Sequence, residues 1–144
     1  IEGISPLEVQ ELKNRFPGLK IMQAIPVLSG VPLEEQKIMQ YIKEYEPVSD
    51  FFLIDTKAPM AGDIGATGLT HDREIDRVIV ESTKVPCIIA GGLDADNVAE
   101  AIHVTHPYGV DSFSLTNYDD ERADTLHCKD PAKVKAFIEA SQNA

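Results

Sequence analysis

The sequence is poor in cysteine, in basic residues and in long apolar runs. Only Cys87 and Cys128 occur among 144 residues, with no CxxC pair and no Cys or His spacing typical of a metal site. Thirteen Lys and Arg stand against 24 Asp and Glu, a formal net charge of −11. This balance argues against a nucleic-acid groove, which needs clustered cations. No apolar run approaches the roughly 20 residues of a membrane helix. We therefore expect a reduced cytoplasmic protein that binds neither nucleic acid nor membrane.

Several catalytic and nucleotide-binding motifs are also absent. The glycine-rich stretch from Gly62 to Gly68 is not followed by Gly-Lys-Ser/Thr, so it is no P-loop, and there is no GxGxxG fingerprint. No Ser-His-Asp arrangement can be inferred from the spacing. The four histidines lack the i, i+4 pairing of metal ligands, which predicts surface residues and neither a metal nor a cofactor. Cys87, inside an apolar run, is expected to pack in the core.

What the chain does contain is a regular alternation of helical and strand patterns. The hydrophobic share of 43% and the charged share of 26% are typical of one globular domain. Capping and 3.6-residue periodicity predict five helices. Short β-rich apolar runs predict four strands, and Phe51–Ile54 has the pattern of a strand buried on both faces. The first helix is expected to begin at Ser5-Pro6 and to stop at Pro17-Gly18, and the fourth to begin at Asp94 or Asp96. The other helices are expected at about Pro32 to Glu44, Asp72 to Ser82 and Pro131 to Ala140. The strands are expected at Leu19–Val27, Phe51–Ile54, Pro86–Ala90 and Gly109–Leu115.

This order predicts an α/β fold in which the strands are parallel and the helices form right-handed crossovers. Two architectures have this order of elements, an open doubly wound sheet and a (β/α)₈ barrel. Four strands would make up half of such a barrel. The four strands should be neighbours in one sheet, in sequence order, and the part of the last strand that is expected to pair is Val110–Ser114. In both architectures, functional residues collect at the carboxyl ends of the strands.

That rule selects the stretch from Ala24 to Gly30, Asp55, the Gly91-Gly92 pair, and Asp111. Asp55 follows four apolar residues, and a carboxyl group at an apolar mouth tends to have the raised pKa of a general acid. The alternative is a capping or loop-anchoring aspartate. Glycines 91 and 92 end a strand before a helix, which suits a phosphate, or they form only a tight turn. The Gly62–Gly68 loop covers a substrate, cradles a phosphate or is an ordinary turn.

Six of these segments, in this order, resemble the phosphoribosylanthranilate isomerase family. The likeness extends over nearly the whole chain and is strongest from Val85 to Ile138. The resemblance implies that residues 1–144 are one segment carrying strands five to eight, the C-terminal half of a parallel (β/α)₈ TIM barrel, with the first four strands absent. The matching segments are Phe51–Thr56, Gly65–Asp72, Pro86–Leu93, Asp96–Ile102, Pro107–Asp111 and Lys129–Val134.

The resemblance also implies an activity, the Amadori rearrangement of N-(5′-phosphoribosyl)anthranilate in tryptophan biosynthesis, catalysed by an intramolecular oxidoreductase without a cofactor. Asp55 matches the family's general acid, and Asp111 matches an aspartate that faces the substrate. The phosphate is expected at Gly91, Gly92 and Ser114. The general base is a cysteine on the absent first strand. Gly65 and Gly68 are expected in a loop over the site.

The chain also departs from the family pattern. Leu115 stands where a glycine would let the backbone approach the phosphate, and the acidic loop that leads to Lys129 is longer and repels anions. The alternatives are therefore a related barrel that acts on or binds another sugar phosphate, and a paralogue without catalysis. The expected partners are a small phosphorylated substrate and, through the open edges of the half-barrel, the missing N-terminal half or a second copy.

Overall fold

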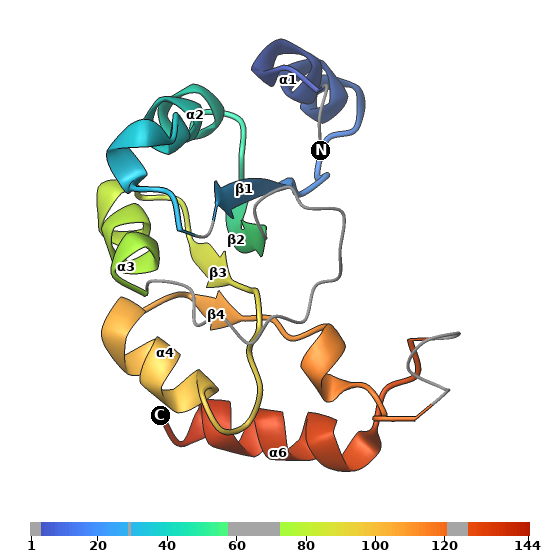
Figure 1. Ribbon diagram of the computed structural model, residues 1–144. Coiled ribbons are helices and arrows are strands. Elements are labelled where there is room, and N and C mark those ends of the chain that lie inside the picture. The colour runs from blue at the N-terminus through green and yellow to red at the C-terminus, as the bar shows by residue number, and fades with distance from the viewer. Residues whose placement is uncertain (1–3, 29, 58–72, 121–126) are drawn as a thin grey trace.

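Strands and helices alternate along the chain (Figure 1). The computed structural model describes residues 4–28, 30–57, 73–120 and 127–144. Within these residues the elements follow one another in a regular order, with short 3₁₀ turns (η) after the first and last strands. They are α1 (Pro6–Arg15), β1 (Met22–Leu28), η1 (Leu33–Glu35), α2 (Ile38–Tyr45), β2 (Phe51–Lys57), α3 (Arg73–Ser82), β3 (Cys87–Ile89), α4 (Val98–Thr105), β4 (Gly109–Val110), η2 (Ser114–Thr116) and α6 (Pro131–Gln142).

The four strands form one parallel sheet in the order β1-β2-β3-β4. Ala24 lies opposite Leu53, Leu53 opposite Ile88, and Ile88 opposite Gly109. The prediction of parallel neighbours in sequence order is therefore confirmed. Parallel neighbours need a crossover between them, and a helix fills each one because it buries its apolar stripe on the sheet.

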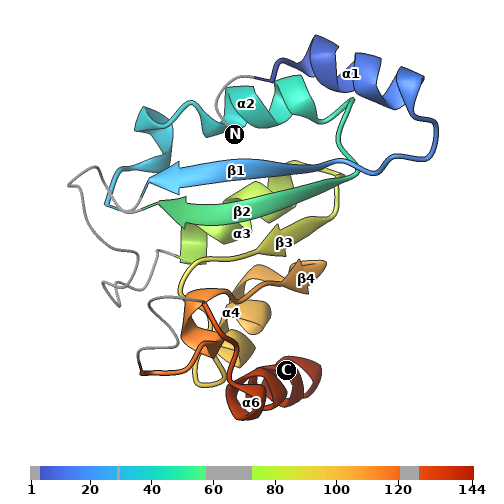
Figure 2. The ribbon, with the colours of Figure 1, turned by 90° about the vertical axis from the view of Figure 1, so that its right-hand side faces the viewer.

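The helices form an arc around one face of the sheet, which is the face that holds the core (Figures 1 and 2). Alternate strand residues point to this face, and Ile25, Phe52, Ile54 and Ile89 are at most 1% exposed. Apolar residues of the helices, among them Ile79 of α3, pack against them. Cys87 is 2% exposed in the same layer, so its prediction as a core residue is confirmed.

The opposite face of the sheet is only partly covered. Met22 and Leu28 of β1 are 51% and 41% exposed, and Phe51 and Leu53 of β2 are half-buried. The prediction that Phe51–Ile54 is buried on both faces is therefore wrong for these residues. The physical reason is that no helix in the described part of the chain packs on this side.

The expected helix from Pro32 to Glu44 is broken into η1 and α2. Gln36, which is 9% exposed, accepts a hydrogen bond from Leu28 N (2.7 Å) and donates to Leu28 O (3.2 Å) and Val31 O (2.7 Å). Its side chain thus satisfies backbone groups at the end of β1 and in the following loop. Because these contacts fix the chain at Gln36, the helix proper begins only at Ile38.

The predicted ends of other elements also need correction. The first strand is shorter and shifted, Met22–Leu28 in place of Leu19–Val27. The helix expected from Asp94 or Asp96 begins at Val98, after a turn in which Asp94 Oδ1 accepts from Asp96 N (2.9 Å) and Asn97 N (3.1 Å). The first and last helices begin as predicted. The capping box of Ser5 and Glu8 is present, and Asp130 caps α6 by accepting from Ala132 N (2.8 Å).

The predicted strand Val110–Ser114 is wrong beyond its first residue, since β4 contains only Gly109 and Val110. Asp111 N still donates to Ile89 O at 2.8 Å, which continues the ladder by one bond. The chain then turns away, because the Ser112 hydroxyl donates to Leu93 O (2.6 Å) and residues 114–116 form the 3₁₀ turn η2. A short loop, hydrogen-bonded to the turn after β3, therefore replaces the end of the strand.

Candidate active site at the carboxyl ends of the strands

Two of the predicted site residues lie in one row across the sheet. Leu53, Ile88 and Gly109 are paired, so two residues further along Asp55, Ala90 and Asp111 form the next row on the same face. The bonds from Ala90 N to Ile54 O and from Asp111 N to Ile89 O, both 2.8 Å, show that the ladder extends to this row. With strands about 4.8 Å apart, the backbones of the two aspartates are roughly 10 Å apart, with only alanine between them.

The two carboxylates differ in their surroundings. Asp55 is half-buried on the partly covered face, where its neighbours Pro26, across the strand, and Leu53, two residues back, are apolar. Asp111 is exposed, at the end of the last strand. One acid thus lies within an apolar face and the other at its rim. Such a pair can place a proton donor on one side of a small ligand and a polar contact on the other.

The turn after β3 requires glycine at two successive positions. Gly91 and Gly92 have φ angles of +89° and +63°, a backbone region that residues with a Cβ adopt only with strain. A Cβ on Gly92 would meet no atom within 4 Å, so the space beside the turn is open. No atom therefore packs against Gly92 on the side where a side chain would stand.

The amino-terminus of α4 contributes less to this turn than the sequence predicted. The Asp94 carboxylate already accepts from the first amides before the helix, and it brings a negative charge of its own. Asn97 Nδ2 donates to Gly92 O at 2.8 Å, which turns that carbonyl toward α4 and the amide of Leu93 to the opposite side. The donors that remain for an anion are thus the backbone amides of the Gly91-Gly92 turn, here called the glycine turn.

The loops that follow β3 and β4 are joined to one another. The bond from Ser112 Oγ to Leu93 O brings the glycine turn next to the loop that carries Ser114, whose side chain is exposed. Lys129, which was not among the predicted site residues, also lies here, and its ammonium group contacts Phe113 O and Thr116 Oγ1 in this loop. A sequence signal for that role is lacking, because 13 residues separate Lys129 from Thr116.

The remaining candidates are not part of this row. Gly65 and Gly68 lie outside the described residues. Burial raises the pKa of Cys87 to about 11, and its side chain lies on the helix-covered face, away from Asp55. Cys128 is half-buried. Across the described ranges, no group of three or more His, Cys, Asp and Glu side chains is placed to hold a metal ion. In the same ranges, no helix has the length and apolar character needed to span a membrane.

The fold and site define the class of protein, a parallel α/β protein with candidate functional groups at the carboxyl ends of its strands. The family described as N-(5'-phosphoribosyl)anthranilate (PRA) isomerase matches residues 8–140. This match covers more than half of the chain, and the chain therefore belongs to that family.

Individual relatives agree with this assignment. The chain is 36% identical over 132 residues to N-(5'-phosphoribosyl)anthranilate isomerase 2 of Methanosarcina mazei, covering 92% of this chain and 53% of the relative. It is 34% identical over 140 residues to the isomerase of Methanocella arvoryzae, covering 96% of this chain and 59% of that protein. The chain thus spans somewhat more than half the length of the relatives it matches.

Solved structures share the fold. The isomerase of Pyrococcus furiosus superposes with a TM-score of 0.68 at 31% identity, over 97% of this chain and 58% of that one. The isomerase of Thermotoga maritima, at 22% identity and a TM-score of 0.66, covers 94% of this chain and 58% of its own and supports the fold alone. In both cases the sheet and helices match a part of a longer chain.

Proposed function

We propose that this chain forms strands five to eight of a phosphoribosylanthranilate isomerase barrel. The complete protein would catalyse the Amadori rearrangement of N-(5′-phosphoribosyl)anthranilate in tryptophan biosynthesis. The observation that carries the proposal is the row of Asp55, Ala90 and Asp111 beside the Gly91-Gly92 turn, on the face of the sheet that the helices leave open. Membership of the isomerase family supports the chemistry proposed for this row.

In the proposed reaction, Asp55 is the general acid. It gives a proton to the ribose ring oxygen, the C1′–O bond breaks, and the ring opens to a protonated Schiff base. A base then removes the C2′ proton, and the resulting enolamine becomes the ketose product. One proton is given and one taken, so the overall reaction is an isomerisation. By its resemblance to the family, the base is a cysteine on strand one, outside residues 1–144.

Asp111 lies at the other end of the row and would contact the substrate from the opposite side. The phosphate would bind between the two joined loops, at Gly91, Gly92 and Ser114. A chain with a net charge of −11 repels an anion at long range. Backbone amides with fixed direction can nevertheless hold a phosphate locally, because each brings the positive end of a peptide dipole.

The partly covered face of the sheet supports the half-barrel in this proposal. In a closed barrel this face fills the interior, and the free edges of β1 and β4 pair with further strands. Side chains such as Met22, 51% exposed, would then be buried. We propose that residues 1–144 are one segment whose barrel is completed by the four preceding strands or by a second copy.

The alternative of a paralogue without catalysis would be favoured if Leu115 filled the site. Its side chain is 39% exposed, which does not support a blocked loop. A related barrel that acts on another sugar phosphate would use the same phosphate loops. Turnover of phosphoribosylanthranilate by the complete protein distinguishes that alternative from the isomerase.

The test of the proposed function is Asp55→Asn in the complete protein. Asparagine keeps the shape of the side chain and removes the acid, so kcat should fall by about two orders of magnitude or more. Asp119→Asn is the matched control, because Asp119 is 87% exposed and lies outside the row, and it should leave kcat unchanged. An Asp55→Asn protein that keeps most of its activity would remove Asp55 from the mechanism.

A further inference from the structure

The side chain of Lys129 contacts the loop that follows β4. Its ammonium group donates to Phe113 O and to Thr116 Oγ1 (3.0 Å), and it lies 4.6 Å from the centroid of the Phe113 ring. The backbone holds Lys129 beside this loop, because Asp130 N donates to Thr116 O (2.9 Å) and Tyr118 N to Cys128 O (3.1 Å). Two neighbouring backbone bonds and three side-chain contacts thus hold the positive charge of Lys129 against η2.

These contacts set the direction of the backbone amides in the loop. The C=O and N–H of one trans peptide point to opposite sides. Because Lys129 holds the carbonyl of Phe113, the amide of Ser114 must point away from Lys129. Thr116 Oγ1 lies 3.2 Å from Phe113 O and 3.4 Å from Ser112 O, so the amide of Phe113 is turned away from Thr116 in the same manner.

Neither Phe113 N nor Ser114 N donates a hydrogen bond to another residue that the structure describes. The amides of Gly92 and Leu93 on the neighbouring turn likewise donate no hydrogen bond to a residue that the structure describes. The bond from Ser112 Oγ to Leu93 O joins that turn to this loop. An ammonium group on a carbonyl oxygen also polarises the peptide and strengthens its N–H as a donor.

We propose that Lys129 is a positioning residue for the phosphate group of the substrate. It acts by holding the loop from Phe113 to Thr116, so that the amides of Phe113 and Ser114 join those of the glycine turn at one anion. Its fixed charge also offsets, at short range, the acidic character of the chain. This inference rests on the proposed function, and it extends that function to a residue whose own side chain need not touch the substrate.

The experiment uses the complete protein with Lys129→Met, Lys129→Arg and, as matched control, Lys135→Met. Lys135 is 75% exposed on α6 and contacts Glu139 at 3.7 Å. Lys129→Met should raise KM by about tenfold, the scale of one lost charged hydrogen bond, and change kcat far less. Inhibition by inorganic phosphate should weaken by a similar factor. Lys129→Arg should restore most of the affinity, and Lys135→Met should match the unmodified protein.

An unchanged KM and phosphate affinity in Lys129→Met would overturn the inference. So would a fall in kcat alone, or a loss that arginine does not rescue, because these outcomes indicate a merely structural lysine. Should Lys129→Met fail to fold, Thr116→Val removes one of the two hydrogen-bond anchors at similar volume. It should then raise KM and weaken phosphate inhibition, and no change in either would overturn the inference.

Calorimetric titration with inorganic phosphate separates this inference from the proposed function. Binding that depends on Lys129 in a protein without isomerase activity would contradict the function and support the positioning role. Isomerase activity with phosphate binding that is independent of Lys129 would support the function and overturn the positioning role. A protein that shows neither turnover nor phosphate binding would overturn both.

Discussion

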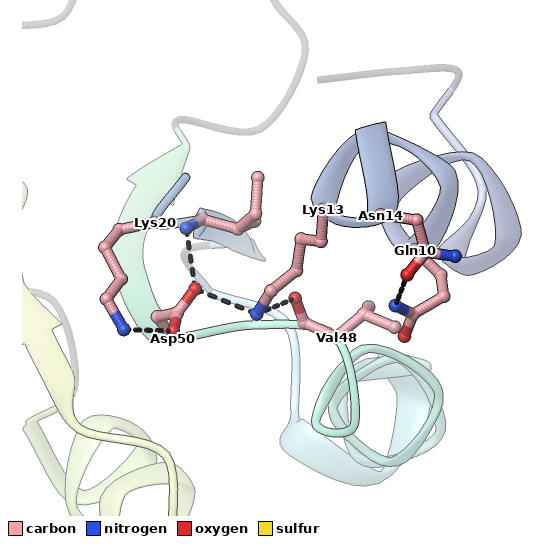
Figure 3. A network of polar contacts seen from close by, with 7 residues as sticks. Gln10, Lys13, Asn14, Lys20, Val48 and Asp50 are labelled. Atoms are coloured by element: carbon pink, nitrogen blue, oxygen red, sulfur yellow. Dashed lines mark hydrogen bonds and ion pairs between the residues drawn. The ribbon is translucent and has the colours of Figure 1, made fainter. Parts of the chain in front are cut away.

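At the scale of single residues, Asp50 connects three segments at the amino-terminal side of the sheet (Figure 3). One carboxylate oxygen accepts from Ile21 N (2.9 Å) and Lys13 Nζ (3.0 Å), and the other accepts from Lys20 Nζ (3.0 Å). The bond from Ile21 N, followed by those from the two lysines, holds the pKa of the Asp50 carboxyl well below its usual range. Its side chain is 18% exposed, so these bonds are partly shielded from water.

Asp50→Asn should therefore destabilise the protein at neutral pH, by about 1–2 kcal/mol, because a charged acceptor of three hydrogen bonds is lost. The folded-state pKa is lowered, so the charge stabilises the fold fully above the unfolded-state value of about 3.9 and loses this effect as the pH falls below it. Urea unfolding should show a constant difference between variant and original from pH 5 to 7, and a smaller one at pH 3.

The control for this prediction is Asp119→Asn, since Asp119 is 87% exposed and forms one ion pair, with Lys133. Exposed ion pairs contribute little, so its unfolding curve should follow that of the original protein. A difference for Asp50→Asn that is as large at pH 3 as at pH 7 would contradict the role of its charge.

At the scale of elements, the link between β1 and α2 depends on the side chain of Gln36. Gln36→Ala removes the partner of Leu28 N and of Val31 O, and Gln36 itself is 9% exposed. Leu28 O loses one of its two donors and keeps the bond from Val31 N (3.4 Å). Unsatisfied groups in such a place should lower the free energy of unfolding by about 1–3 kcal/mol. Thermal melting of the complete protein measures the loss.

Gln40→Ala provides the matched control on the same segment. Gln40 is exposed and donates a hydrogen bond to the side chain of Glu44, at 2.9 Å, one helical turn further on. Exposed contacts of this spacing contribute a few tenths of a kcal/mol at most. Equal melting temperatures for the Gln36 and Gln40 variants would show that the Gln36 contacts do not support the loop.

At the scale of the whole molecule, the open face of the sheet and the edges of β1 and β4 predict association. A polypeptide of residues 1–144 exposes apolar side chains such as Met22 and Leu28, and large exposed apolar faces are rare in monomers. Sedimentation should therefore show dimers or larger species, and an apolar dye should bind. We also predict no isomerase activity for such a polypeptide by itself, because the base in the proposed mechanism is a cysteine outside residues 1–144.

A well-folded monomer with a cooperative melt and no second polypeptide would contradict this view. In that case the face is covered by residues of this same chain. Addition of the remaining strands as a separate polypeptide gives the converse measurement. Isomerase activity that appears only on mixing would support a barrel completed from two parts.

The parallel order of the strands and the positions of Asp55 and Asp111 at the carboxyl ends of strands could be predicted from the sequence. Both follow from local patterns, namely apolar runs that alternate with amphipathic helices, and acids placed directly after those runs. The roles of Gln36, Asp50 and Lys129 could not be predicted, because each depends on groups that only the folded chain brings together. Lys13, for example, is 37 residues from Asp50 in sequence.

The sequence by itself determined which segments contain strands and helices, and that the strands are parallel, since these depend on neighbouring residues and on periodicity. Tertiary structure alone decided that Ser112 turns toward Leu93 and ends β4 after two residues, and that one face of the sheet remains partly uncovered. The physical reason is that hydrogen bonds and burial between distant segments are satisfied only after the sheet has formed, and local patterns do not encode them.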